Sequence, residues 1–164
     1  MSRINRISLL SLATLVLISV ATAVAAGINV AGGTLATDSS SVIPDDFLPA
    51  ECAGMSITAI VSGTDGTLAN ELIIGTSGDD NLSGKGGDDC IVGGGGNDIL
   101  DGGPGNDIIL GNSGDDTING GQGDDILYGM GGNDDLDGGA QTDICDGGAG
   151  TDTAARCETE INIP

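Results

Sequence analysis

The stretch GGGGNDILDGGPGNDIIL, residues 93–110, contains two consecutive copies of one nine-residue pattern. Each copy has a glycine-rich segment, then Asn-Asp, then three residues with an aliphatic side chain in the middle. The pattern continues in both directions and gives nine copies over residues 75–155. A period held over so many copies predicts a repeat protein in which each unit packs against its neighbours.

Three positions of the pattern hardly vary along the chain. Position one is glycine in every copy, and position four is glycine except at Gln141. Position eight is Leu or Ile in the first seven copies and then becomes Cys145 and Ala154. Residues 66–74 form a degenerate copy with Glu71 at position six. Position six is aspartate in all nine regular copies: Asp80, Asp89, Asp98, Asp107, Asp116, Asp125, Asp134, Asp143 and Asp152.

The composition limits what this chain can bind. Its 164 residues carry a net charge of −21, with 31 glycines, one Phe, one Tyr, no Trp and no His. Such an acidic protein repels nucleic acid and anionic membrane surfaces, so we expect neither as a partner. The acidic side chains must therefore be solvated or hold cations.

The pattern resembles the glycine-rich nonapeptide repeat of RTX, or haemolysin-type, calcium-binding proteins. This resemblance implies an all-β fold, a parallel β-roll with two repeats per coil, a six-residue loop and a three-residue strand in each repeat. It also implies several calcium ions between the loops of neighbouring coils, held by the nine position-six aspartates and by loop carbonyls. The departures at Gln141 and Thr142 put the loop of Asp143 in doubt, and Asp152 lies in a terminal coil.

Physical chemistry also favours an ion. Ordering a glycine-rich repeat loses more backbone entropy than one buried Leu or Ile compensates. Stacked coils also bring carboxylates together, so a cation is needed to oppose their repulsion. Calcium suits the composition because it takes oxygen ligands, including backbone carbonyls. The repeats 75–155 contain no Glu, which argues against an EF-hand loop.

The flanking segments predict an exported, bacterial protein. Residues 1–25 have Arg3 and Arg6, an apolar run and small residues that fit a cleavage site, as in a secretory signal peptide. An uncleaved membrane anchor is the alternative. We expect residues 26–65 to form a leader or cap, residues 75–155 the β-roll and residues 156–164 a C-terminal cap, in an extracellular location.

Four cysteines predict two disulfides, because an even number in an exported chain usually pairs. Three pairings are possible. We expect Cys52–Cys90 to attach the leader to the roll and Cys145–Cys157 to close the last coil. The chain has no His and no C-x-x-C motif, so a zinc site is not expected.

The two outer faces of the predicted roll differ. Residues at positions seven and nine point outward, since strand side chains alternate. One sheet is mostly polar, whereas the other presents an apolar stripe that we expect the leader to cover in part. The remainder, at Ile108, Ile126 and Tyr128, is a candidate surface for self-association or for a protein partner.

No pattern of a catalytic centre is present in the sequence. It lacks a His for a Ser–His pair, an H-E-x-x-H motif and a G-x-S-x-G motif, so we do not expect an enzyme. The sequence predicts an exported protein that folds on binding several calcium ions. The alternative is a calcium-dependent cell-surface adhesion or assembly module that uses the apolar outer face.

Overall fold

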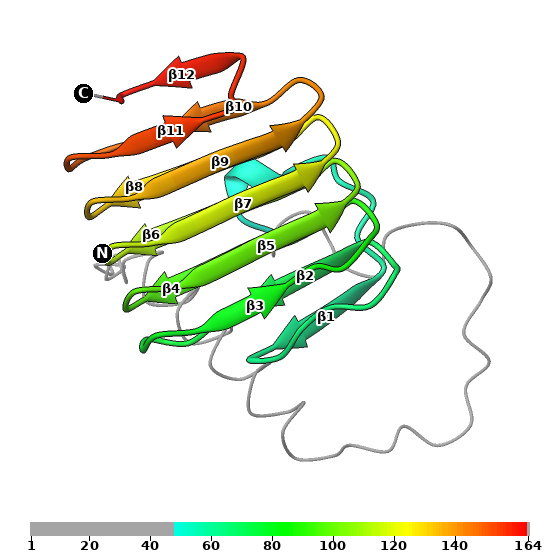
Figure 1. Ribbon diagram of the computed structural model, residues 1–164. Coiled ribbons are helices and arrows are strands. Elements are labelled where there is room, and N and C mark those ends of the chain that lie inside the picture. The colour runs from blue at the N-terminus through cyan, green and yellow to red at the C-terminus, as the bar shows by residue number, and fades with distance from the viewer. Residues whose placement is uncertain (1–47, 164) are drawn as a thin grey trace, which may run out of the picture. The chain divides into compact units, whose positions relative to one another are not determined.

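The computed structural model describes residues 48–163, which form two parallel β-sheets and one short 3-10 helix, η2 (Ala50–Cys52) (Figure 1). The predicted signal peptide 1–25 and much of the predicted leader 26–65 lie outside these residues. No helix within residues 48–163 is long and apolar enough to cross a bilayer.

From β2 onward, the strands alternate between the two sheets along the chain. The seven-stranded long sheet contains, in order, β1 (Ala59–Ser62), β2 (Glu71–Ile74), β4 (Cys90–Gly95), β6 (Ile108–Ser113), β8 (Ile126–Gly131), β10 (Ile144–Asp146) and β12 (Thr159–Ile161). The five-stranded short sheet contains β3 (Asn81–Ser83), β5 (Ile99–Pro104), β7 (Thr117–Gln122), β9 (Asp135–Ala140) and β11 (Thr153–Ala155).

One coil contains two nine-residue repeats. Ile91 pairs with Ile109, and Ile109 pairs with Leu127, so each residue lies beside the residue two repeats later. All pairings are parallel, as in a solenoid built by stacking one unit. The predicted all-β parallel β-roll with two repeats per coil is therefore confirmed.

The predicted strand length of three residues is wrong for the central coils. Strands β4 to β9 each have six residues, because positions two and three of the following repeat also pair with the next coil. Gly94 pairs with Asn112 and Gly95 with Ser113, while Gly93 is skipped in the register. The chain thus bends at position one without leaving the sheet.

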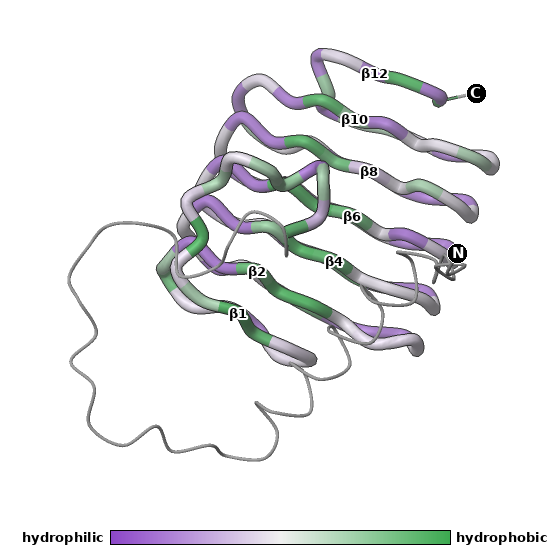
Figure 2. Tube along the Cα trace, turned by 180° about the vertical axis from the view of Figure 1, so that it is seen from behind, coloured by the Kyte–Doolittle hydropathy of each residue, from purple (hydrophilic) through white to green (hydrophobic). Residues whose placement is uncertain are grey.

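The interior is a single stack of position-eight side chains. Buried residues from both sheets form one apolar cluster: Ile73, Leu82, Ile91, Leu100, Ile109, Ile118, Leu127, Leu136 and Cys145. Figure 2 shows the hydrophobic segments of successive strands lying over one another, with hydrophilic turns beside them. Each repeat as far as residue 137 contributes one Leu or Ile to this core, so the core is narrow.

A second apolar cluster lies outside the long sheet. Residues 48–57, which we call the strap, place Leu48, Cys52 and Ile57 against Leu72 and Leu110 of the sheet. Cys52 is bonded to Cys90, and their Cα atoms are 6.0 Å apart. The strap therefore covers part of the apolar stripe, as the sequence predicted.

The C-terminal segment closes the other end of the roll. Strand β12 pairs with β10, with Ile144 opposite Thr159. Cys145 is bonded to Cys157, and Cys145 occupies the place of the core aliphatic in its repeat. Both disulfides have the pairing that we expected.

We predict that Ile109→Ala, at a position with 0% exposure, lowers the free energy of unfolding by about 2–5 kcal/mol. Ile99→Ala is the matched control, since Ile99 is 52% exposed and should change stability by about 0.5 kcal/mol or less. Urea denaturation in the presence of calcium measures both. Equal losses in the two variants would contradict the single-file core.

Candidate metal centre

The position-six carboxylates form two ladders, one along each edge of the roll. The backbone N–H of Asp89 donates to Oδ1 of Asp107, and the N–H of Asp107 donates to Oδ1 of Asp125, both at 2.8 Å. On the other edge, the N–H of Asp98 donates to Oδ1 of Asp116, also at 2.8 Å. Each bond joins residues eighteen apart, so these carboxylates tie each coil to the next.

In eight of the nine aspartates that the sequence predicted as metal ligands, the second carboxylate oxygen, Oδ2, is buried and has no hydrogen-bond partner. A buried carboxylate oxygen without a donor is unusual, because most buried polar atoms in proteins are paired. The eight residues are Asp89, Asp98, Asp107, Asp116, Asp125, Asp134, Asp143 and Asp152.

Position one has room for glycine only. A Cβ at Gly102 would collide with Oδ2 of Asp107 and with the carbonyl oxygen of Gly120 in the next coil. The same collisions, with the position-six Oδ2 of the same repeat and a carbonyl of the next coil, recur at Gly84 and Gly120. This constraint explains why position one is always glycine: it leaves a small space edged by carboxylate and carbonyl oxygens.

The turns before these eight aspartates have left-handed backbone conformations at positions two and four. Position two has φ between 72° at Lys85 and 113° at Gly94. Position four has the same sign of φ in every such turn, and Gln141 reaches 95° without being glycine. The loop of Asp143, which the sequence put in doubt, therefore has the same geometry as the others.

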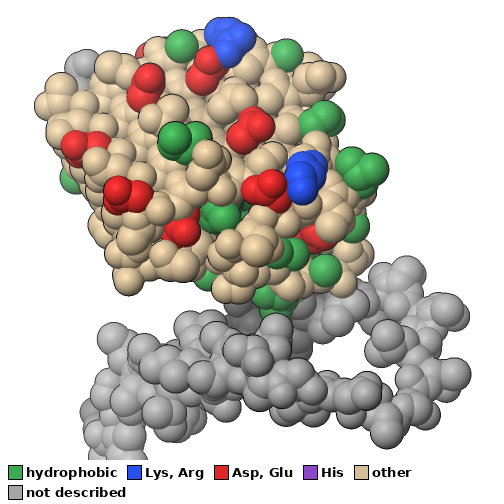
Figure 3. Space-filling view, turned by 60° about the horizontal axis from the view of Figure 1, so that its bottom comes forward, with side chains coloured by type: hydrophobic (Ala, Val, Ile, Leu, Met, Phe, Trp, Pro, Cys, Tyr) green, Lys and Arg blue, Asp and Glu red, His purple; other side chains and the backbone are tan. Residues whose placement is uncertain are grey.

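Burial disfavours the charged form of a carboxylate and so raises the pKa of several of these aspartates. Removal from water raises the pKa of Asp89 and Asp107 to about 7, although the backbone N–H bonds oppose the change and neighbouring carboxylates add to it. Burial likewise raises the pKa of Asp116 and Asp125 to about 6. Acidic side chains are more frequent than basic ones on the face shown in Figure 3, so that face offers little positive charge.

Position five forms a second set of ladders on the exposed side of the turns. The N–H of Asn106 donates to Oδ1 of Asp88, and the N–H of Asp124 donates to Oδ1 of Asn106. Along each edge, Asp and Asn alternate: Asn70, Asp88, Asn106, Asp124 on one, and Asp79, Asn97, Asp115, Asn133 on the other. Like charges at position five are therefore separated by a neutral residue.

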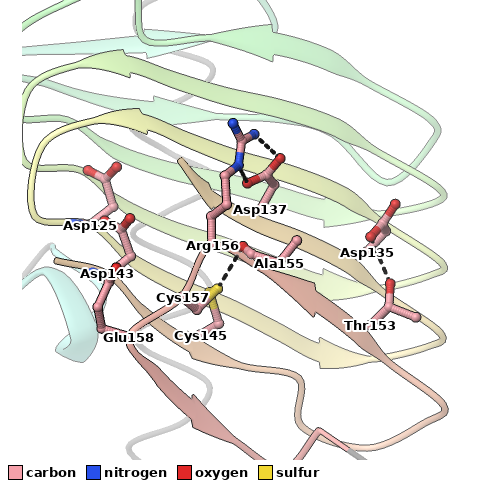
Figure 4. Close-up of a disulfide and its surroundings, with 10 residues drawn as sticks. All are labelled: Asp125, Asp135, Asp137, Asp143, Cys145, Thr153, Ala155, Arg156, Cys157 and Glu158. Carbon is pink, nitrogen blue, oxygen red and sulfur yellow. Dashed lines mark hydrogen bonds and ion pairs between the residues drawn. A yellow bond between two sulfur atoms is a disulfide. The ribbon is translucent and has the colours of Figure 1, made fainter. Parts of the chain in front are cut away.

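The ends of the position-six ladders use residues that the sequence analysis did not assign. At the C-terminal end, Oε2 of Glu158 accepts the N–H of Asp143 at 2.6 Å, the role that aspartate has elsewhere (Figure 4). In the same C-terminal segment, Arg156 forms an ion pair with Asp137. Glu158 stands fifteen residues after Asp143, outside the repeat period, so the periodic pattern gave no signal for it.

At the N-terminal end, Asp80 differs from the other eight predicted ligands. Its Oδ2 accepts the N–H of Thr76 at 2.6 Å and the hydroxyl of Thr76 at 2.9 Å. In the preceding turn, Glu71 accepts the same two bonds from Thr67. The nine aspartates thus share one position in the repeat but fall into two chemical environments.

The oxygen atoms fit a hard cation better than a transition metal. No group of three or more His, Cys, Asp or Glu side chains gathers at one point within residues 48–163. The oxygen atoms available as metal ligands at each turn are one carboxylate oxygen and nearby backbone carbonyl oxygens, such as that of Gly120 beside Asp107. Calcium accepts such mixed oxygen ligands, whereas zinc prefers nitrogen and sulfur.

We predict that Gly102→Ala weakens calcium-dependent folding strongly, because its methyl group would occupy the space beside Asp107 Oδ2. Gly131→Ala is the control, since its Cβ would meet nothing closer than 3.6 Å. The calcium concentration at the folding midpoint, followed by circular dichroism, should rise about tenfold or more for Gly102→Ala only. Equal midpoints for the two variants would refute the assignment.

We also predict that acid stabilises the calcium-free fold. The folded-state pKa values of about 6 to 7 exceed the ordinary value of 3.8, so the folded state binds more protons between these limits. Stability in calcium-free buffer should therefore increase as the pH falls from about 7 to about 5. The amount of β-structure in chelator, followed by circular dichroism across this range, tests the sign, and a loss of β-structure on acidification would contradict it.

Comparison with protein families finds four overlapping copies of the RTX calcium-binding nonapeptide repeat, at residues 65–100, 93–127, 101–136 and 119–154. No curated protein and no solved structure gives a significant match. The matched residues 65–154 include more than half of the chain and contain both carboxylate ladders. With the same repeats folded as a parallel solenoid, the chain belongs to the family of RTX calcium-binding nonapeptide repeat proteins.

Proposed function

We propose that this protein is an exported calcium-binding protein that folds on binding several calcium ions. The observation that carries the proposal is the set of eight buried carboxylate oxygens without a hydrogen-bond donor. The repeat family supports calcium as the ion. The proposed ligands are the eight aspartates from Asp89 to Asp152 that have this unpartnered oxygen, together with carbonyl oxygens of the neighbouring turns.

The chain and the ion would have complementary roles. Bound calcium supplies positive charge and accepts oxygen ligands. In the chain, a backbone N–H of the neighbouring coil donates to Oδ1 of each carboxylate, whereas Oδ2 lies beside the position-one glycine. Burial, with a smaller contribution from neighbouring carboxylates, raises the pKa of Asp107, so charged position-six carboxylates are unfavourable in the ion-free roll. Folding is therefore coupled to the ion.

Two features support export. The N-terminal sequence has the composition of a secretory signal peptide over residues 1–25. The structure contains two disulfides and no free cysteine among its described residues, which suits an oxidising compartment. We therefore propose cleavage near residue 25 and an extracellular location, where calcium is available to the repeats.

The RTX solenoid is a structural calcium-binding fold that is not typical of enzymes. The alternative function, adhesion or assembly through the apolar face, has less surface than the sequence predicted. Ile108 and Tyr128 pack against the second apolar cluster, in which the strap covers the long sheet. Of the predicted surface, this leaves Ile126, which lies beside the 36% exposed Ile144. Calcium-coupled folding therefore has the stronger support.

The test is a titration of residues 26–164 with calcium and, separately, magnesium, followed by far-ultraviolet circular dichroism. We expect a cooperative gain of β-structure with calcium only, because magnesium requires a stricter geometry and retains its water. A chain that is fully folded in chelator, or that responds equally to magnesium, would contradict the proposal.

A charge variant locates the ions. Asp107→Asn retains an oxygen for the N–H of Asp89 but removes the charge, so the variant should bind about one calcium ion fewer by equilibrium dialysis. Asp135→Asn is the control, because Asp135 is exposed and its Oδ1 bonds to Thr153 on the outer face. The same number of ions in both variants would exclude Asp107 as a ligand.

A further inference from the structure

The first two turns of the roll differ from all later turns in how their acidic side chain is satisfied. Thr67 donates its N–H to Oε2 of Glu71 at 2.7 Å and its hydroxyl to Oε1 at 2.6 Å. Thr76 donates both groups to Oδ2 of Asp80. These two carboxylates therefore have threonine donors at the oxygen that corresponds to Oδ2 of the later aspartates, which has none.

The difference follows from one residue, at position two. The eight later turns have a left-handed residue there, whereas neither Thr67 nor Thr76 has a positive φ. Position four follows the same division, since Ala69 and Gly78 also have ordinary φ values. A β-branched residue strongly disfavours the left-handed conformation, so threonine at position two selects the other turn and directs its N–H to the carboxylate.

A basic side chain adds positive charge at the same end. Lys85 donates from Nζ to the carbonyl oxygen of Gly66 at 3.0 Å and lies 3.5 Å from Asp65. Lys85 is the one basic residue within repeats 75–155. Its ammonium group thus lies beside the first turn, whose carbonyl it binds.

This end also has apolar support outside the long sheet. In the second cluster, Leu48, Cys52 and Ile57 of the strap are buried against Leu72 of β2 and also against Cys90 and Leu110 of the following strands β4 and β6. The Cys52–Cys90 bond joins the strap to β4 across this cluster. By contrast, a central repeat contributes one large core side chain.

We propose that residues 48–83 form a cap that folds without calcium, and that Thr67 and Thr76 take the place of the ion at Glu71 and Asp80. Calcium-dependent coils then begin with the turn that contains Asp89 and are added to this preformed edge. This inference rests on the proposed function, because it divides the repeats into ion-independent and ion-dependent turns. It removes Asp80 from the metal ligands that the sequence predicted.

Hydrogen–deuterium exchange of the oxidised chain 26–164 tests the division. In chelator, we expect slow exchange of amides in residues 57–83 and rapid exchange in residues 93–155. Added calcium should slow exchange in residues 93–155 and change the cap little. Exchange in chelator that is equally rapid in both segments would overturn the cap.

The variant Thr76→Gly converts the turn GTSGDD into GGSGDD, a sequence of the ion-dependent type. Exchange of residues 66–83 in chelator should accelerate about tenfold or more, since two hydrogen bonds to a carboxylate are weakened or lost. Thr151→Gly is the control, because Thr151 lies at position five and its N–H bonds to Asn133. Equal exchange in the parent and in Thr76→Gly would overturn the role of Thr76.

The outcomes separate this inference from the proposed function. If calcium slows exchange in neither segment, calcium-coupled folding fails, while slow exchange of residues 57–83 in chelator would still establish the cap. If calcium is required equally in residues 57–83 and 93–155, calcium-coupled folding stands and the cap fails.

Discussion

The hydrogen bond from a position-six backbone N–H to the carboxylate eighteen residues later is the interaction on which this structure depends. It repeats along both edges of the roll, as between Asp89 and Asp107, and fixes the stacking of successive coils. The bond uses one carboxylate oxygen and leaves the other buried without a donor. Glycine at position one follows, because any side chain there would occupy the space beside that oxygen.

Position five shows that such a ladder does not require charge. Asn106 accepts the N–H of Asp124 through its amide oxygen, in the same way as Asp88 accepts that of Asn106. Alternation of Asp and Asn at position five keeps like charges apart, and these side chains are exposed to water. From Asp89 to Asp152, position six is aspartate in every repeat although it is buried, and burial raises the pKa of Asp107 among them. The hydrogen bond alone does not explain this charge, whereas a bound cation does.

Much of the fold was predictable because the repeat makes each physical requirement visible many times. The period, the aliphatic at position eight and the aspartate at position six specify the coil, the core and the ladders. The apolar stripe and the placement of Cys52 and Cys90 predicted the strap, since exposed apolar surface and an unpaired cysteine each required a partner. These inferences needed no knowledge of the turn geometry.

The features that could not be predicted lie beyond the last regular repeat or depend on the hydrogen bonds of single atoms. Glu158 takes the role of an aspartate after an interval of fifteen residues, which depends on the path of the Cys145–Cys157 loop. The difference between Asp80 and the other aspartates depends on a threonine N–H and hydroxyl, although β-branching at position two was a signal in the sequence. The six-residue strands depend on pairing that continues beyond the bend at position one.

The two ends of the roll meet the same physical problem by different means. A terminal coil has a neighbour on one side only, so its carboxylates and its core lack half of their partners. The N-terminal end supplies threonine donors, Lys85 and an apolar strap held by a disulfide. The C-terminal end supplies Glu158, Arg156 and a disulfide whose sulfur atoms fill the core where aliphatic side chains become small. The disulfides therefore lie toward the ends of the roll, while the central coils have the narrow apolar core alone and depend on position six, where buried carboxylate oxygens lack a protein donor.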